Sequence, residues 1–227
     1  MVTMRPILDA AADLLLGATC PACDCPGWGL CVRCWAQLQQ PPHAVSRGVH
    51  VPVWAACDYR PLLEHVVPRY KDDGALHLAK PLGRLLARAV LAHRPPASAV
   101  LVPVPSIPGA VKARGFDHAA RLGQLAARAT GLPIARGVLA RARAGGDQRG
   151  LSREAREANL AGSMWASAPD APVLVLDDVA TTGASLREAI RALTTAGAEV
   201  IGAAVVADAE NSRDAWRDCP PHPLGGR

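Results

Sequence analysis

Two adjacent carboxylates, Asp177 and Asp178, follow four apolar residues and precede the small turn Thr-Thr-Gly-Ala-Ser. The apolar run Val173–Leu176 predicts a buried strand of a parallel sheet, and a helix is expected over Leu186–Ala196. Ligands of open α/β sheets bind at the carboxyl ends of strands. Backbone N–H groups at a helix start attract an anion, whereas paired carboxylates suit hydroxyl groups or Mg²⁺. A sugar phosphate, which carries both a phosphate and hydroxyl groups, fits this pattern.

The segment Asp-Asp-Val-Ala-Thr-Thr-Gly-Ala-Ser resembles the phosphoribosyl-pyrophosphate (PRPP) signature of type I phosphoribosyltransferases. The resemblance implies that Asp177 and Asp178 bind the ribose 2′- and 3′-hydroxyls. It also implies that the turn surrounds the 5′-phosphate with Thr181, Thr182, Gly183, Ala184 and Ser185. A plain strand end with a Ser or Thr helix cap would explain one acid and one threonine, but not the paired acids before Thr-Thr-Gly. The sequence lacks the Gly-Lys-Ser/Thr element of a Walker P-loop at this turn.

A second cluster of reactive side chains consists of two Cys-x-x-Cys pairs separated by seven residues. Its members are Cys20, Cys23, Cys31 and Cys34. This short spacing is typical of a zinc ribbon, in which four thiolates hold a structural Zn²⁺ and leave no open position for water. Cys25 is an alternative to Cys23 as a ligand. Disulfides or redox chemistry are the other interpretations, and a cytosolic setting and the two close pairs favour the metal.

Composition bounds the chain to one α/β domain and a small appendage. It has 227 residues, of which 50% are hydrophobic. Residues 60–156 contain 17 basic and 6 acidic side chains, a net charge of +11, which suits a polyanion such as nucleic acid or pyrophosphate. No stretch has the length and hydropathy of a membrane span, and the acidic Met4–Leu16 segment is unlike a signal peptide. We therefore expect a cytoplasmic protein.

Strands and helices alternate from about residue 99 onward. This pattern predicts a doubly wound, mainly parallel α/β sheet with a small N-terminal zinc ribbon. The strands are expected at Val49–Tyr59 (strand or hairpin), Ala99–Pro103, Gly137–Arg141, Gly162–Ala166 and Glu199–Ala207. The helices are expected at Pro61–Tyr70, Ala75–His93 with a kink or restart at Pro81, and Phe116–Thr130 ending at Gly131. The segments Ser106–Gly115 and Ala142–Glu157 are expected to be loops.

A narrower resemblance covers roughly residues 10–207. The order of a Cys₄ ribbon, Tyr-Lys-Asp-Asp-Gly, Val-Pro-Val-Pro, Arg-Gly-Phe, Gln-Arg-Gly-Leu-Ser and the PRPP motif resembles the ComF (GntX-like) family of phosphoribosyltransferase-fold proteins. The resemblance implies PRPP binding with Mg²⁺ and a link to competence, the uptake of DNA. The chain departs from the family pattern at Asp117-His118, where Asn-Gln is expected, and at Asp72-Asp73-Gly74, where Arg-Gly-Asp is expected.

Basic and polar residues of the intervening loops are candidates for the rest of the site. Lys71 and Arg114, and less strongly Lys112, are candidates for the pyrophosphate, because arginine and lysine bind phosphate oxygens. Gln148, Arg156 and Asn159 are candidates for a loop over the ligand. The alternative interpretation is surface charge for Lys71 and Arg114, and the polar face of a helix N-terminus for Arg156 and Asn159. His118 could serve in acid–base chemistry or be structural.

Two functions remain open at this stage. The first is a phosphoribosyltransferase that binds PRPP with Mg²⁺ and transfers phosphoribosyl to an unknown nitrogen acceptor. The second is a single-stranded DNA-handling module, in which the ribbon and the basic middle region bind nucleic acid and the nucleotide pocket only binds. We divide the chain into helix and ribbon (1–45), a phosphoribosyltransferase-like domain (46–207) and a disordered tail (208–227).

Overall fold

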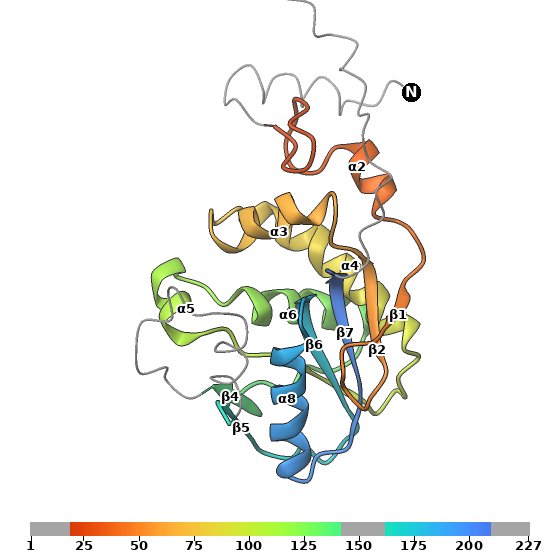
Figure 1. The fold of residues 1–227 in the computed structure, drawn as a ribbon, viewed down its shortest axis with the longest axis vertical. Coiled ribbons are helices and arrows are strands. Elements are labelled where there is room, and N and C mark those ends of the chain that lie inside the picture. Colours follow the sequence, from red (N-terminus) through yellow and green to blue (C-terminus); the bar gives the residue numbers. More distant parts are fainter. Residues whose placement is uncertain (1–18, 142–161, 210–227) are drawn as a thin grey trace, which may run out of the picture.

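The computed structural model describes residues 19–141 and 162–209 (Figure 1). The helix expected at Met4–Leu16 and the tail beyond residue 209 lie outside these ranges. A five-stranded sheet occupies the centre, in the order β1-β2-β7-β6-β3. Its strands are β1 (His43–Val45), β2 (Val53–Asp58), β3 (Val100–Pro103), β6 (Val173–Ala180) and β7 (Val200–Asp208). Only the edge pair β1–β2 is antiparallel among these strands, so the predicted doubly wound, mainly parallel α/β fold is confirmed.

Helices cover both faces of this sheet. They are α2 (Val32–Gln37), α3 (Leu63–Lys71), the 3₁₀ helix η1 (Leu76–Leu78), α4 (Ala79–Ala92), α5 (Pro108–Arg114), α6 (His118–Thr130) and α8 (Ala184–Thr195). The side chains of α3, α4 and α6 pack on one face, and those of α8 pack on the other. Figure 1 shows α3 between the cysteine segment and the sheet.

Alternation along β6 divides its side chains between these two layers. Val173 and Val175 pack with the α8 layer, whereas Leu174 and Leu176 pack with the α3, α4 and α6 layer. Successive side chains of a strand point to opposite faces, which is why a strand buried on both sides is apolar at every position. The two carboxylates that continue β6 are therefore directed toward different layers.

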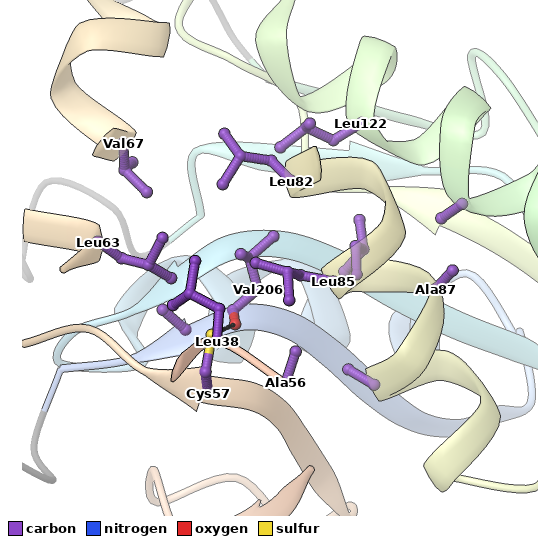
Figure 2. Close-up of a cluster of buried hydrophobic side chains, with 14 of the residues drawn as sticks. Leu38, Ala56, Cys57, Leu63, Val67, Leu82, Leu85, Ala87, Leu122 and Val206 are labelled. Atoms are coloured by element: carbon purple, nitrogen blue, oxygen red, sulfur yellow. Dashed lines mark hydrogen bonds between the residues drawn. The ribbon is translucent and has the colours of Figure 1, made fainter. Parts of the chain in front are cut away.

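The cysteine segment packs on the main core instead of standing apart. Cys20, Cys34 and Leu38 are buried together with Leu63 and other residues of α3 and α4. Figure 2 shows Leu38 among side chains from α3, α4 and the sheet. Burial of apolar surface contributes about 25 cal/mol per Å². The segment thus gains stability from the α/β core as well as from any metal.

Several expected elements differ in detail from those observed. The loop expected at Ser106–Gly115 contains α5, which begins at Pro108, where the missing proline N–H costs no intrahelical bond. The helix expected at Ala75–His93 is a 3₁₀ helix, η1, followed by α4, and Pro81 lies in the first turn of α4, in agreement with the expected restart. β4 (Leu139–Arg141) and β5 (Met164–Ala166) form a separate antiparallel pair outside the main sheet. Glu188 of α8 holds this pair, accepting a hydrogen bond from the Met164 N–H at 2.8 Å.

Candidate functional site

The paired carboxylates lie within the last part of β6 and not beyond its end. Asp177 pairs with Val205 of β7 in the parallel ladder, and the strand continues to Ala180. Each carboxylate accepts the next backbone N–H: Asp178 N–H donates to Asp177 at 2.9 Å, and Val179 N–H donates to Asp178 at 2.6 Å. These bonds fix the two side chains at the carboxyl edge of the sheet, where open α/β folds bind ligands.

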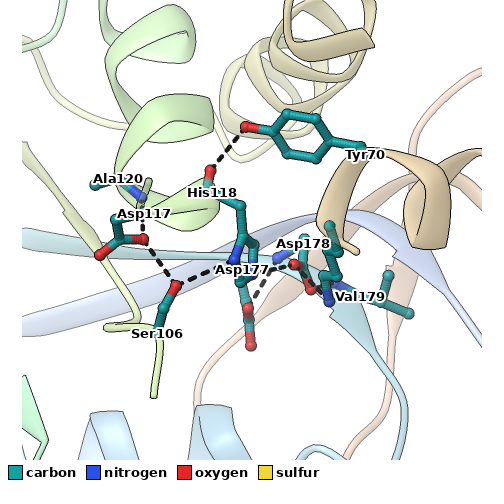
Figure 3. A network of polar contacts seen from close by, with 9 residues as sticks. Tyr70, Ser106, Asp117, His118, Ala120, Asp177, Asp178 and Val179 are labelled. Atoms are coloured by element: carbon teal, nitrogen blue, oxygen red, sulfur yellow. Dashed lines mark hydrogen bonds and ion pairs between the residues drawn. The ribbon is translucent and has the colours of Figure 1, made fainter. Parts of the chain in front are cut away.

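Asp178 points toward the α3 and α6 layer and is contacted there by the side chains of Lys71 and His118. Lys71 Nζ, at the end of α3, lies 2.6 Å from Asp178 Oδ2. His118 Nε2, at the start of α6, lies 3.0 Å from the same oxygen (Figure 3). Asp178 is buried, so three elements far apart in sequence meet on one carboxylate. Lys71, predicted from sequence as a pyrophosphate residue, is thereby placed beside the predicted ribose residue.

The two neighbouring acids have pKa values shifted in opposite directions. Burial by itself would raise the pKa of Asp178, but the Lys71 ammonium and the contact with His118 hold that pKa below its ordinary value. The pKa of Asp177 is raised, first by burial and then by the Asp178 charge. Burial opposes ionisation of Lys71, yet Asp178 outweighs it and raises the pKa of Lys71. Asp178 and Lys71 are therefore an ion pair across the neutral range, whereas Asp177 takes up a proton more readily.

The start of α6 is fixed by a second network. Asp117 caps the helix by accepting the Ala120 N–H at 3.1 Å, and Ser106 Oγ donates to the same Asp117 oxygen at 2.7 Å. Ser106 Oγ also lies 3.2 Å from His118 Nδ1. The buried Tyr70 donates its hydroxyl to the His118 backbone carbonyl at 3.2 Å. Tyr70 precedes Lys71, so one turn of α3 positions both the lysine and the backbone of the histidine.

The turn between β6 and α8 is held in one conformation by local and long-range contacts. Gly183 adopts φ +75° and begins α8, and Thr182 Oγ1 accepts the Ala184 N–H at 3.2 Å. A Cβ on Gly183 would lie 2.7 Å from the Arg47 carbonyl oxygen, so only glycine fits without a shift. Arg187 Nη1 clamps the turn from behind, donating to the Thr182 carbonyl at 2.8 Å and the Arg47 carbonyl at 3.0 Å. Thr181 is exposed and Ser185 is half-buried at this turn.

The remaining sequence candidates fall into two groups. Lys112 lies exposed on α5, and Arg114 ends that helix, but nothing is described of the Arg114 side chain. Gln148, Arg156 and Asn159 lie outside the described residues, in the segment that β4 and β5 bracket.

The residues that support the paired acids and the Thr-Thr-Gly turn were not predicted from the sequence. Asp117 carried a helix-start signal, since aspartate is a preferred N-cap, but its link to Ser106 depends on the loop between β3 and α5. Arg187 follows Gly183 by four residues, and its contact with Arg47 spans 140 positions. Arg141 of β4 is half-buried; burial lowers its pKa, and the Asp177 and Glu188 charges oppose that effect. No local pattern signals Arg187 or Arg141.

The four predicted cysteines lie close together. Their sulfur atoms are all within 4.8 Å of one another, and Cys23 Sγ lies 3.7 Å from Cys31 Sγ. A tetrahedral zinc with Zn–S bonds of ~2.3 Å would have sulfur–sulfur edges of ~3.8 Å, so the spacing fits the metal. It does not fit a disulfide, whose sulfurs are bonded at ~2.0 Å. The group could hold a metal ion, and Cys25 is not a member of it.

Backbone and charge effects around these sulfurs agree with a bound cation. The Cys31 N–H points at Cys20 Sγ and the Cys34 N–H at Cys31 Sγ, each at 3.4 Å, and such contacts stabilise thiolates. The hydrogen bond between Cys20 and Cys34 lowers the pKa of Cys20 to about 4 and, followed by burial, raises the pKa of Cys34, so without a cation ionisation of one sulfur disfavours that of the other. A divalent cation would remove that penalty.

Part of this chain matches a family model, and the chain is similar to a solved structure. Residues 114–221 match the family model of the phosphoribosyl transferase domain. The matched range includes β6, the Thr-Thr-Gly turn and α8. An adenine phosphoribosyltransferase from Rhodothermus marinus DSM 4252 has a structure similar to this chain, with 18% sequence identity and a TM-score of 0.33 over 77% of this chain and 85% of that one. No protein of curated function matches this chain significantly.

Among helices of residues 19–141 and 162–209, none has the length and hydropathy needed to cross a membrane.

Proposed function

We propose that this protein binds PRPP together with Mg²⁺ at the carboxyl edge of β6 and transfers its phosphoribosyl group to a nitrogen nucleophile. The observation that carries the proposal is the sequence of groups along one strand, turn and helix. The buried acids come first, then Gly183 in its left-handed conformation, then the start of α8. The matched phosphoribosyl transferase domain, residues 114–221, supports the same assignment.

The ribose and the 5′-phosphate have natural places in this arrangement. Carboxylate oxygens of Asp177 and Asp178 accept hydrogen bonds from the 2′- and 3′-hydroxyls. The 5′-phosphate binds the backbone N–H groups of the turn at the positive end of α8. Its contacts are assigned to Thr181, Thr182, Gly183, Ala184 and Ser185. Arg187 holds this turn in place through the Thr182 carbonyl.

The pyrophosphate is assigned to Lys71, with Arg114 and Lys112 as further candidates. In the ligand-free chain Lys71 Nζ is bound to Asp178, so PRPP would take over both partners of this ion pair. The hydroxyl donates to Asp178 and the ammonium turns to the pyrophosphate. Mg²⁺ prefers oxygen ligands, commonly binds through substrate phosphates, and would neutralise the pyrophosphate charge. Gln148, Arg156 and Asn159 are proposed to close over the bound ligand.

Transfer breaks the bond between ribose C1 and the pyrophosphate oxygen and forms a bond from C1 to the acceptor nitrogen. Positive charge develops on the ribose, and negative charge develops on the leaving group. Buried carboxylates near the ribose and the Lys71 ammonium near the pyrophosphate stabilise these charges, because they are already oriented before the reaction. The acceptor itself is not assigned.

We further infer that the chain is a ComF-type protein whose Cys₄ segment binds structural zinc. The spacing of the four sulfurs supports the metal, and the order of motifs along the chain supports the family. Four thiolate ligands leave no coordination position for substrate, so the zinc would contribute to folding and not to chemistry. The family resemblance carries with it a link to competence and DNA uptake.

A second function, single-stranded DNA binding, is favoured by one exposed aromatic residue. Trp28 beside the cysteines is 58% exposed and packs its ring 5.2 Å from that of His77. Exposed aromatic rings stack on unpaired bases, and basic residues neutralise phosphates. This function predicts binding of a single-stranded oligonucleotide that weakens steeply with salt and is reduced by W28A. Unchanged binding by W28A would show that the cysteine segment does not take part in DNA binding.

The decisive experiment for the main proposal is calorimetry of the folded protein with PRPP, with and without Mg²⁺. The isosteric D177N/D178N variant is the test, because asparagine keeps the size of each side chain and an amide oxygen that can still accept from Lys71 and His118, whereas Ala would leave a cavity. Each charge-assisted hydrogen bond contributes about 1.5–3 kcal/mol, so the double variant should bind at least ~100-fold more weakly. Wild-type protein without PRPP affinity, or equal affinities, would refute the proposed function.

A further inference from the structure

The contacts of His118 determine how many protons its ring carries. Ser106 Oγ donates its single proton to Asp117 Oδ1, which also accepts the Ala120 N–H. A hydroxyl that has donated its proton can only accept, so the 3.2 Å contact places an acceptor oxygen opposite His118 Nδ1. Nε2 faces a carboxylate oxygen of Asp178 at 3.0 Å. Both ring nitrogens thus face acceptor oxygens, an arrangement that a doubly protonated imidazolium satisfies.

The charges around this ring come from three elements. They are Asp178 and Asp177 of β6, Lys71 of α3 beyond Asp178, and Asp117 and Arg121 near the start of α6. The Tyr70 hydroxyl donates to the backbone carbonyl of His118 and not to the His118 ring. The His118 ring therefore lies between Asp178, which it contacts directly, and Asp117, which it reaches through Ser106.

Asp178 needs a second cation if the lysine is to move. The Asp178 side chain is 7% exposed, and a carboxylate so buried is strongly destabilised when its partner leaves. Lys71 is more exposed, at 27%, and reaches the carboxylate from the end of a helix. His118 is fixed on its far side by Ser106 and by the capped start of α6. Of the two cations, the lysine can change partner and the histidine stays.

We propose that His118 is a positioning residue that keeps Asp178 ionised and oriented toward the ribose when Lys71 transfers to the pyrophosphate. This inference rests on the proposed function. Ser106 links Asp117 to the ring and orients its Nδ1 side, which leaves Nε2 facing Asp178.

The test compares two ligands in H118Q. Glutamine can donate an N–H to Asp178 from nearly the position of Nε2, but it carries no charge. PRPP with Mg²⁺ should bind at least ~10-fold more weakly than to wild type, a loss of about 1.4 kcal/mol, because Lys71 must leave Asp178. Ribose 5-phosphate lacks the pyrophosphate and leaves Lys71 in place, so its affinity should change much less. An equal loss for both ligands would overturn the proposal.

Two further measurements separate this inference from the proposed function. Nitrogen NMR of the imidazole rings in the ligand-free protein at pH 7, assigned by the loss of signals in H118Q, should show both His118 nitrogens protonated. S106A, which removes only a hydroxyl, should convert the ring to its neutral Nε2–H form. A neutral ring in the wild type would refute the inference even if PRPP binds. Wild type that binds neither ligand would refute the proposed function. H65Q, which changes an exposed histidine of α3, is the matched control and should bind as wild type.

Discussion

Lys71 and Asp178 are 107 positions apart, yet their charged atoms lie 2.6 Å from each other at the carboxyl edge of the sheet. The contact joins a residue predicted to bind pyrophosphate to a residue predicted to bind ribose. In the ligand-free protein each charged group is the partner of the other. Substrate binding is thus expected to be an exchange of partners within a preformed ion pair.

Replacing Lys71 should change the affinity for PRPP and the affinity for ribose 5-phosphate differently. In K71M the pyrophosphate loses a charged donor, so PRPP should bind about 10- to 100-fold more weakly. Ribose 5-phosphate should bind as well as before or better, because its hydroxyl no longer competes with an ammonium. Calorimetry with both ligands measures this difference. The exposed Lys80 of α4 provides the control K80Q, and equal losses for both ligands in K71M would contradict the exchange.

The cysteine cluster should bind about one zinc ion per chain. Elemental analysis of protein purified without added metal measures this, and C31S should lose the zinc together with part of the thermal stability, because Cys20 and Cys34 pack in the main core. C25S is the matched control, since Cys25 lies in the same segment but outside the four-sulfur group. Full zinc content in C31S, or loss in C25S, would show that the ligands are assigned wrongly.

Gly183 should not tolerate a side chain. In G183A the new Cβ meets the Arg47 carbonyl at 2.7 Å, and the residue is forced into a left-handed conformation. Such strain costs roughly 1–3 kcal/mol and should lower the melting temperature by several degrees. Binding of ribose 5-phosphate should fall as well, because the turn shifts. G109A is the control, since Gly109 lies in α5 with open space around its Cα. Similar melting temperatures for both variants would exclude the steric clash.

The raised pKa of Asp177 should appear as opposite pH effects on stability and binding. A carboxyl group whose pKa is raised on folding stabilises the protein below its unfolded pKa, which is near 3.8, and this stability is lost as the pH rises through the folded pKa. D177N cannot ionise, so its melting temperature relative to wild type should increase between pH 4 and pH 8. PRPP affinity of the wild type should rise over the same interval relative to D177N, because hydroxyl groups prefer the ionised acceptor. A pH-independent difference between the two proteins would contradict a raised pKa.

The local features of this protein were determined by its sequence. The apolar run before Asp177 is buried on both sides and forms a parallel strand, and Gly131 ends α6 in a left-handed conformation as predicted. Cys20, Cys23, Cys31 and Cys34 meet because their spacing within one short segment leaves few other arrangements. In each case the deciding interactions lie within about a dozen residues, which is the distance over which periodicity, turns and Cys-x-x-Cys pairs are informative.

The tertiary structure decided which residues surround these features. Alternation along β6 directs Asp178 toward α3 and α6, but only the packing of those helices brings Lys71 and His118 to it. The same packing joins Ser106 to Asp117 and places the Arg47 carbonyl behind Gly183. Such contacts depend on how whole elements settle on a shared core, because side-chain packing and charge pairing act between neighbours in space, whatever their distance in sequence.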